Sequence, residues 1–167
     1  MDPQTFSQTL TIQYGYTAYT FAINLKGLTD ADAMHQPDPG GNGLNWVAGH
    51  IVGSRAGTLA VLGQEPSFPA DKYERYNRGS SPMTDEQEGT VPLSEIVADF
   101  ASTQDALQVG LAALTTEKLS AKAPFSPGND ENETVGSLMA GLVFHEGYHI
   151  GQLGVLRRMA GEEGMIK

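Results

Sequence analysis

The 167-residue chain contains no cysteine, which excludes disulfide bonds, thiolate metal sites and a sulfur nucleophile supplied by the protein. Basic residues are also scarce, because ten Lys and Arg face twenty Asp and Glu and the formal charge is −10. Such a charge repels phosphate backbones and anionic lipids, so we expect neither a nucleic-acid nor a membrane partner. There is no apolar run of membrane-spanning length and no signal-peptide pattern, and the expected location is cytoplasmic.

Apolar residues recur at intervals of three and four in four stretches of the chain, a spacing typical of amphipathic helices. Residues 29–43 and 63–92 are rich in proline and glycine and are expected to be connections. The length and the 40% hydrophobic content fit a single domain over residues 1–167. The sequence therefore predicts an all-α four-helix bundle, with helices from Thr5 to about Leu28, from an N-cap at Asn42 or Asn45 to about Leu62, from Leu93 to about Leu114, and from an N-cap at Thr134 to Gly161.

The second predicted helix has glycine at every fourth position of one face, at Gly49, Gly53 and Gly57. Glycine costs a helix about 1 kcal/mol per position relative to alanine, so this face is expected to receive a closely packed neighbour or to border a cavity. Two interpretations of the long connection 63–92 stay open. Either it contacts a ligand, or it is a surface crossover whose tyrosines pack on the bundle; the candidate contacts are Tyr73, Tyr76, Asn77 and Arg78.

The last helix carries polar residues on the face that its periodicity predicts to be buried. That face consists of Leu138, Leu142, His145, His149, Gln152, Leu156 and Met159. An unsatisfied polar group costs roughly 1 to 3 kcal/mol on burial, so these histidines and the glutamine need partners. His145 and His149 are one helical turn apart, with Cβ atoms about 5 to 6 Å from each other, and both imidazoles can reach one metal ion.

His50 is the third histidine predicted to face the core, and it lies on the glycine-rich helix. Three imidazoles leave a coordination position for water or substrate, as in catalytic metal sites. Imidazole suits several divalent metals, of which we expect zinc or nickel. Gln152 lies one turn beyond His149 and is a candidate to bond an imidazole, a metal-bound water or a substrate, or else the backbone. His35, in a proline-rich connection, is expected to be a surface residue.

Residues 145–149 also spell HExxH, the signature of zinc proteases. In the metzincin class a glycine and a histidine follow at fixed positions, but here those positions hold Gln152 and Val155. Only Glu162 and Glu163 remain downstream as carboxylate ligands, and no edge strand is predicted that could hold a peptide. A metalloprotease is therefore a remote alternative.

Glu146 is the residue on which the protease interpretation depends. On a helical wheel it points about 80° away from the mean direction of His145, His149 and Gln152, given 3.6 residues per turn. We therefore expect Glu146 on the flank of the site. Glu146 and Gln152 are the two candidate catalytic residues, each acting from the flank or through a metal ligand.

Two segments resemble the DinB-like superfamily of metal-binding helical bundles: LNWVAGHIVGSR, which contains His50, and FHEGYHIGQLGVLRRMAG, which contains His145 and His149. The resemblance covers essentially the whole chain, and its most specific part runs from His145 to Gln152. It implies a bundle with up-down-down-up connectivity and long crossovers, and frequently a homodimer. It also implies a metal held by one histidine of the second helix and two of the last, positions that His50, His145 and His149 match one for one.

Some members of this superfamily are thiol S-transferases that use a metal-activated, low-molecular-weight thiol, and related proteins isomerise or hydrolyse small molecules. The resemblance therefore implies a metal-dependent transferase or hydrolase that acts on a small molecule. Because the chain has no cysteine, a cosubstrate would have to supply the sulfur. The alternative is a non-catalytic bundle that binds a metal or a small ligand, for example in a stress response.

Overall fold

The computed structural model describes residues 2–38, 40–69, 71–81, 83 and 89–165. Within these ranges the chain is helical, and its only β pairing is one isolated bridge between Lys122 and Thr134. The all-α prediction is confirmed. None of the helices in the described part of the chain is long and apolar enough to span a bilayer.

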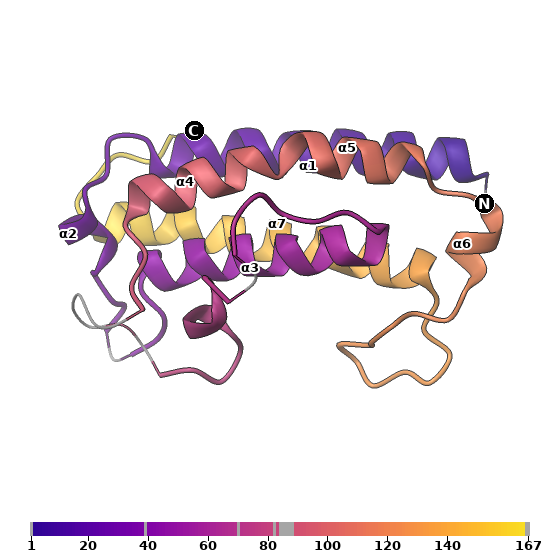
Figure 1. The fold of residues 1–167 in the computed structure, drawn as a ribbon. Coiled ribbons are helices and arrows are strands. Elements are labelled where there is room, and N and C mark those ends of the chain that lie inside the picture. The colour runs from indigo at the N-terminus through magenta and orange to yellow at the C-terminus, as the bar shows by residue number, and fades with distance from the viewer. Residues whose placement is uncertain (1, 39, 70, 82, 84–88, 166–167) are drawn as a thin grey trace.

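The long helices lie side by side and form the bundle (Figure 1). They are α1 (Pro3–Leu25), α3 (Leu44–Leu62), α7 (Val135–Met159), and α4 (Leu93–Ser102) continued by α5 (Gln104–Ala112). The short helices α2 (Asp30–Ala33), η1 (Glu74–Tyr76) and α6 (Thr116–Ser120) lie in the connections. In Figure 1, α1 and α7 run from right to left, whereas α3 and the α4–α5 rod run from left to right.

The ends of the helices follow from local side-chain chemistry. Asp2 accepts a hydrogen bond from the Thr5 amide and caps α1, and Thr134 forms a capping box with Ser137 at the start of α7. Helix α7 is followed by Gly161, whose φ of 88° lies in the left-handed region that glycine adopts readily. The predicted N-cap and closing glycine of the last helix are therefore confirmed.

The start of α3 differs from the prediction. Gly43 occupies the N-cap position and no side chain caps the helix. Asn45 lies inside the helix and is buried, where its amide donates to the Val91 carbonyl and its oxygen accepts from the Tyr76 hydroxyl. Neither asparagine is thus the cap, because Asn45 anchors the crossover rather than the end of its own helix.

The third predicted helix is divided in two at Thr103. The Thr103 hydroxyl donates to the Phe100 carbonyl, and the buried residue separates α4 from α5. Threonine hydroxyls compete for helix carbonyls in this way and bend the helix axis. Helix α5 ends at Ala112, two residues before the predicted end at Leu114.

Because α3 and α4 run in the same direction, the chain must return along the length of α3 before α4 can begin (Figure 1). The connection 63–92 makes this return and places two buried tyrosines on the glycine face of α3. A Cβ atom at Gly49 would overlap the Tyr76 ring, and one at Gly53 would lie 3.2 Å from the Tyr73 Cβ. The predicted close approach at these glycines is confirmed, as is the packing of the tyrosines on the bundle.

Two hydrophobic clusters form the core, one at each end of the bundle. In the first, Phe21 of α1 stacks on Phe100 of α4 with ring centroids 3.9 Å apart. The second includes Tyr14 of α1. The guanidinium of Arg55, from α3, lies 4.0 Å from the Phe100 ring centroid and 5.4 Å from that of Tyr14. A buried arginine therefore joins the two apolar clusters.

Candidate metal centre

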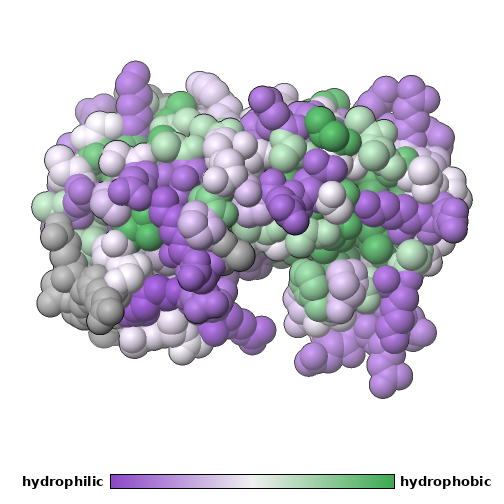
Figure 2. All heavy atoms as spheres, in the orientation of Figure 1, coloured by the Kyte–Doolittle hydropathy of each residue, from purple (hydrophilic) through white to green (hydrophobic). Residues whose placement is uncertain are grey.

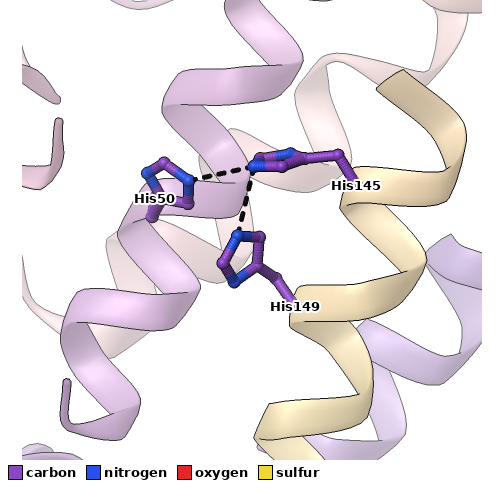
Figure 3. Close-up of side chains that lie close together, drawn as sticks. All are labelled: His50, His145 and His149. Carbon is purple, nitrogen blue, oxygen red and sulfur yellow. Dashed lines mark hydrogen bonds between the residues drawn. The ribbon is translucent and has the colours of Figure 1, made fainter. Parts of the chain in front are cut away.

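Three histidine side chains converge between α3 and α7 (Figure 3). His50 extends from α3, and His145 and His149 extend from successive turns of α7. The Nε2 atom of His145 lies 3.3 Å from that of His50 and 3.1 Å from that of His149. All three ligand atoms fall within 4.8 Å of one another, and this is the one such group among the described residues.

In two of the rings the Nδ1 atom, which points away from the cluster, has a hydrogen-bond acceptor. His50 Nδ1 lies 2.8 Å from the Tyr76 carbonyl oxygen, and His149 Nδ1 lies 2.7 Å from Gln152 Oε1. Each Nδ1 must therefore carry the proton and donate, which leaves both Nε2 atoms as bare lone pairs. Orienting partners of this kind are usual for histidines that bind metals.

Three Nε2 atoms facing one another at this distance need an electrophile between them. Even if His145 carries its proton on Nε2, that single proton cannot satisfy both neighbouring lone pairs. Tetrahedral ligation at about 2.0 to 2.1 Å sets adjacent ligand nitrogens about 3.3 Å apart, close to the two measured distances. The three residues therefore fit a divalent metal ion, and the ligand set predicted from the sequence is brought together. The chemistry of three imidazoles does not select one metal.

The electrostatics of the cluster also favour ligation. Burial lowers the pKa of His145 to about 4, and the neighbouring His149 and His50 lower it further. Burial likewise lowers the pKa of His50 and of His149, although the hydrogen bonds that their Nδ1 atoms donate to the Tyr76 carbonyl and to Gln152 Oε1 raise it. Neutral imidazole is the form that binds a metal, so the folded chain holds these side chains ready at neutral pH.

The cluster lies in a groove between α3 and α7 with a volume of about 1270 Å³. In Figure 2 the surface is hollowed between two lobes, formed by the crossover on the left and the 121–134 connection on the right. Trp46 stacks on His50 with ring centroids 4.8 Å apart and donates through its indole nitrogen to the Ser80 hydroxyl. The third glycine of α3, Gly57, lines this groove and has no atom within 4 Å of a Cβ position. The glycine face thus meets the tyrosines at one end and the groove at the other.

The face of α7 that packs into the core is only partly the one predicted. Leu138 and Leu156 are buried in the core as expected. The histidines and Gln152 are half-buried and line the groove, and Met159 is 44% exposed. The core also receives the neighbouring face, which includes Glu146, Ile150 and Leu153. Periodicity treats a glutamate as polar and turns it outward, but here an arginine of another helix compensates its charge.

Glu146 has a buried ionic partner. Both of its oxygens accept from Arg55, with Nε 2.9 Å from Oε2 and Nη2 bonded to Oε1. The Thr17 hydroxyl of α1 also donates to Glu146, and Arg55 Nη1 donates to Gln104 of α5. Glu146 is 4% exposed and does not line the groove. The expectation that it lies off the direction of the histidines agrees with this placement.

The two downstream glutamates that a zinc protease could use as ligands have other partners in this structure. Glu162 Oε2 lies 3.3 Å from Arg157 Nη2, and the Glu163 carbonyl accepts from Arg157 Nε at 2.8 Å. Neither residue belongs to the histidine cluster. His35 is exposed and outside the groove, as the sequence predicts.

Three contributors to the site were missed from the sequence: Arg55, Trp46 and the backbone carbonyl of Tyr76. An arginine five residues after His50 on a glycine-rich helix is a signal for Arg55, because a charge within an apolar stretch needs a buried partner. The Tyr76 carbonyl has no such signal, since every residue carries one.

Comparison with known proteins agrees with the fold and with the histidine cluster. No curated protein matches the sequence. The model of the DinB superfamily matches residues 16–153, which include all three histidines and most of the chain. The helical architecture and the three-histidine cluster fit a metal-binding protein of that kind. The chain therefore belongs to the DinB superfamily.

Proposed function

We propose that this protein is a metal-dependent enzyme that activates a small thiol or water at the three-histidine centre, in the manner of a thiol S-transferase. The observation that carries the proposal is that the three Nε2 atoms face an open groove rather than a closed core. A three-histidine set leaves room for a further ligand, which is the arrangement of reactive rather than structural sites. Zinc or nickel is the proposed metal.

A bound divalent cation supplies one thing to this chemistry, a lowered pKa for a thiol or water that reaches it. The chain's own residues do the rest. Tyr76 and Gln152 hold the imidazole rings of His50 and His149 in one tautomer and orientation. In the transfer, the thiol releases its proton to solvent, its sulfur bonds the electrophilic carbon, and the leaving group departs with the electrons of the bond that breaks. The sulfur comes from a cosubstrate, because the chain has no cysteine.

The non-catalytic alternative requires a fourth metal position closed by a side chain, and Gln152 is the candidate for closing it. In this structure the Gln152 oxygen is bonded to His149 Nδ1, on the far side of the ring from the Nε2 cluster. The arrangement supports an open position and therefore favours the enzyme over a purely structural site.

Screening low-molecular-weight thiols against alkyl and aryl halides, with metal-loaded and chelator-treated protein, tests the proposal. We expect turnover that requires the metal, that His50→Ala abolishes, and that His35→Ala leaves unchanged, since His35 is exposed and outside the groove. Hydrolysis of small esters and amides, assayed in parallel, tests the activation of water. No metal-dependent turnover in either screen, with metal binding intact, would favour the non-catalytic bundle.

A further inference from the structure

The groove extends well beyond the three histidines in both directions. On α7 its lining runs from Ser137 to Met159, and on α3 from Trp46 to Gly57, with the histidines near the middle of each helix segment. At about 1.5 Å of rise per residue, Ser137 is roughly 12 Å along the axis from His145, and Met159 is roughly 15 Å from His149 on the other side. The cavity of about 1270 Å³ exceeds the roughly 300 to 1,000 Å³ of most small-molecule sites. It has room for one ligand on each side of the metal centre.

One end of the groove is apolar, and we call it the Phe125 end, after Phe125, Leu138, Leu142 and Phe144. Phe125 and Phe144 are 45% and 74% exposed, so their rings are open to a ligand. Glu133 also lines this end, but both of its oxygens accept hydrogen bonds from serine hydroxyls, of Ser126 and Ser137. Apart from this hydrogen-bonded carboxylate, the described residues that define the end offer hydrophobic surface.

The opposite end is defined by Trp46, Arg78, Val155 and Met159, and we call it the Arg78 end. Arg78 is the one Lys or Arg among the described residues that line the groove, and it forms no ion pair with a described residue. Its place beside the metal centre follows from its chain neighbours. The Tyr76 carbonyl bonds His50, and the Ser80 hydroxyl bonds the indole of Trp46, which stacks on His50.

From this asymmetry we infer that the groove holds two small molecules at once: a carboxylate-bearing thiol at the Arg78 end and an apolar electrophile at the Phe125 end. The assignment rests on the proposed function and gives each end its substrate class. The guanidinium of Arg78 supplies a charge-assisted partner for a carboxylate. The aromatic and aliphatic surface at the other end supplies burial for an electrophile that has no charge to satisfy. The two reactants then approach the three-histidine centre from opposite sides.

Binding experiments on the zinc-loaded protein test the inference without any assay of turnover. Mercaptopropionate carries the carboxylate and mercaptoethanol lacks it, so their affinities by calorimetry isolate the contribution of Arg78. Arg78→Gln should weaken the binding of mercaptopropionate about two- to fivefold, which is the range for an exposed charge pair. The affinity for mercaptoethanol should not change. Lys122→Gln removes the same charge from an exposed position outside the groove and should alter neither.

The apolar end is probed with phenylnaphthylamine, a neutral dye whose fluorescence rises on burial. Phe125→Ser should weaken binding of the dye. Val109→Ser, at an exposed position on α5 outside the groove, should leave dye binding unchanged. Saturating mercaptopropionate should leave the dye bound. Competition between the two probes, or equal effects of Arg78→Gln on both thiols, would overturn the inference. If the probes bind separately but no thiol transfer is found, the proposed function fails while the two-ligand groove stands.

Discussion

Arg55 of α3 and Glu146 of α7 form a bidentate ion pair in the centre of the bundle, with side-chain exposures of 0% and 5%. The pair lies one residue from His145 and five from His50. Through Thr17 and Gln104 it also reaches α1 and α5. It therefore fixes the two helices that carry the three histidines against each other and against the rest of the bundle.

Removing one partner of this pair should destabilise the fold strongly, because an uncompensated buried charge costs about 3 to 5 kcal/mol. We expect Arg55→Met alone to lower the free energy of unfolding by roughly that amount, and Arg55→Met with Glu146→Leu to be less destabilised than the sum of the single changes. Urea unfolding of the metal-free variants measures this. Additive effects would show that the pair is not coupled.

His50 should be required for tight metal binding, since it supplies the third Nε2 atom of the cluster. We expect His50→Ala to abolish high-affinity zinc binding. Glu146→Gln should lower the free energy of unfolding but leave zinc binding by the folded protein nearly intact, and the double change Glu162→Ala with Glu163→Ala should not affect zinc binding. Zinc titration with a competing chromophoric chelator distinguishes the variants. If His50→Ala retains zinc binding and the Glu162→Ala, Glu163→Ala double variant loses it, a protease-like ligand set would be supported instead.

Gln152 should influence metal affinity through His149, whose Nδ1 it holds at 2.7 Å. Replacing such an orienting partner typically costs about 10- to 100-fold in metal affinity. We therefore expect Gln152→Leu to weaken zinc binding in that range and Gln152→Glu, which keeps the acceptor, to preserve it. Similar affinities for the leucine variant and the wild type would mean that the hydrogen bond does not orient the ring.

The stability of the metal-free protein should fall as the pH is lowered from 7 to 5. The folded-state pKa of His145 is lowered to about 4, mainly by burial, and those of His50 and His149 are lowered as well. The unfolded chain therefore binds more protons below about pH 6.5, and acid shifts the equilibrium toward it. Melting temperatures across this range check the sign, and His145→Asn should reduce the slope. A melting temperature that is constant or rises toward pH 5 would contradict the prediction.

Homodimerisation is expected through an exposed stripe of α1. Ile12, Tyr16 and Tyr19 are 60%, 71% and 66% exposed, and their spacing places them on one face of the helix, away from the groove. Large apolar side chains gathered on one exposed face are typical of protein contacts. Sedimentation should give a dimer for the wild type and a monomer for Tyr16→Asp, with Val109→Asp as the control. A wild-type monomer at all concentrations would disprove the dimer.

The sequence predicted the helices and the shared face of His145 and His149 well, because both depend on spacing within one stretch of the chain. His145 and His149 share a face by virtue of their four-residue separation, whatever packs against it. The rotation of α7 about its own axis depends on another helix, since Glu146 can face the core only where Arg55 meets it. The break at Thr103 and the burial of Asn45 likewise follow from contacts with partners that periodicity does not contain.

The contact between Gly49 and Tyr76 links helix packing to the metal centre. The Tyr76 ring fills the space that a side chain at position 49 would need, and the carbonyl of the same residue holds His50. Position 76 must therefore supply a ring of this shape and the hydroxyl that bonds Asn45, whereas any residue brings the carbonyl. A single methyl group added at Gly49 would displace the ring, carry the carbonyl with it and release His50. The absorption spectrum of cobalt bound at the three histidines would then report on whether the crossover is correctly folded against α3.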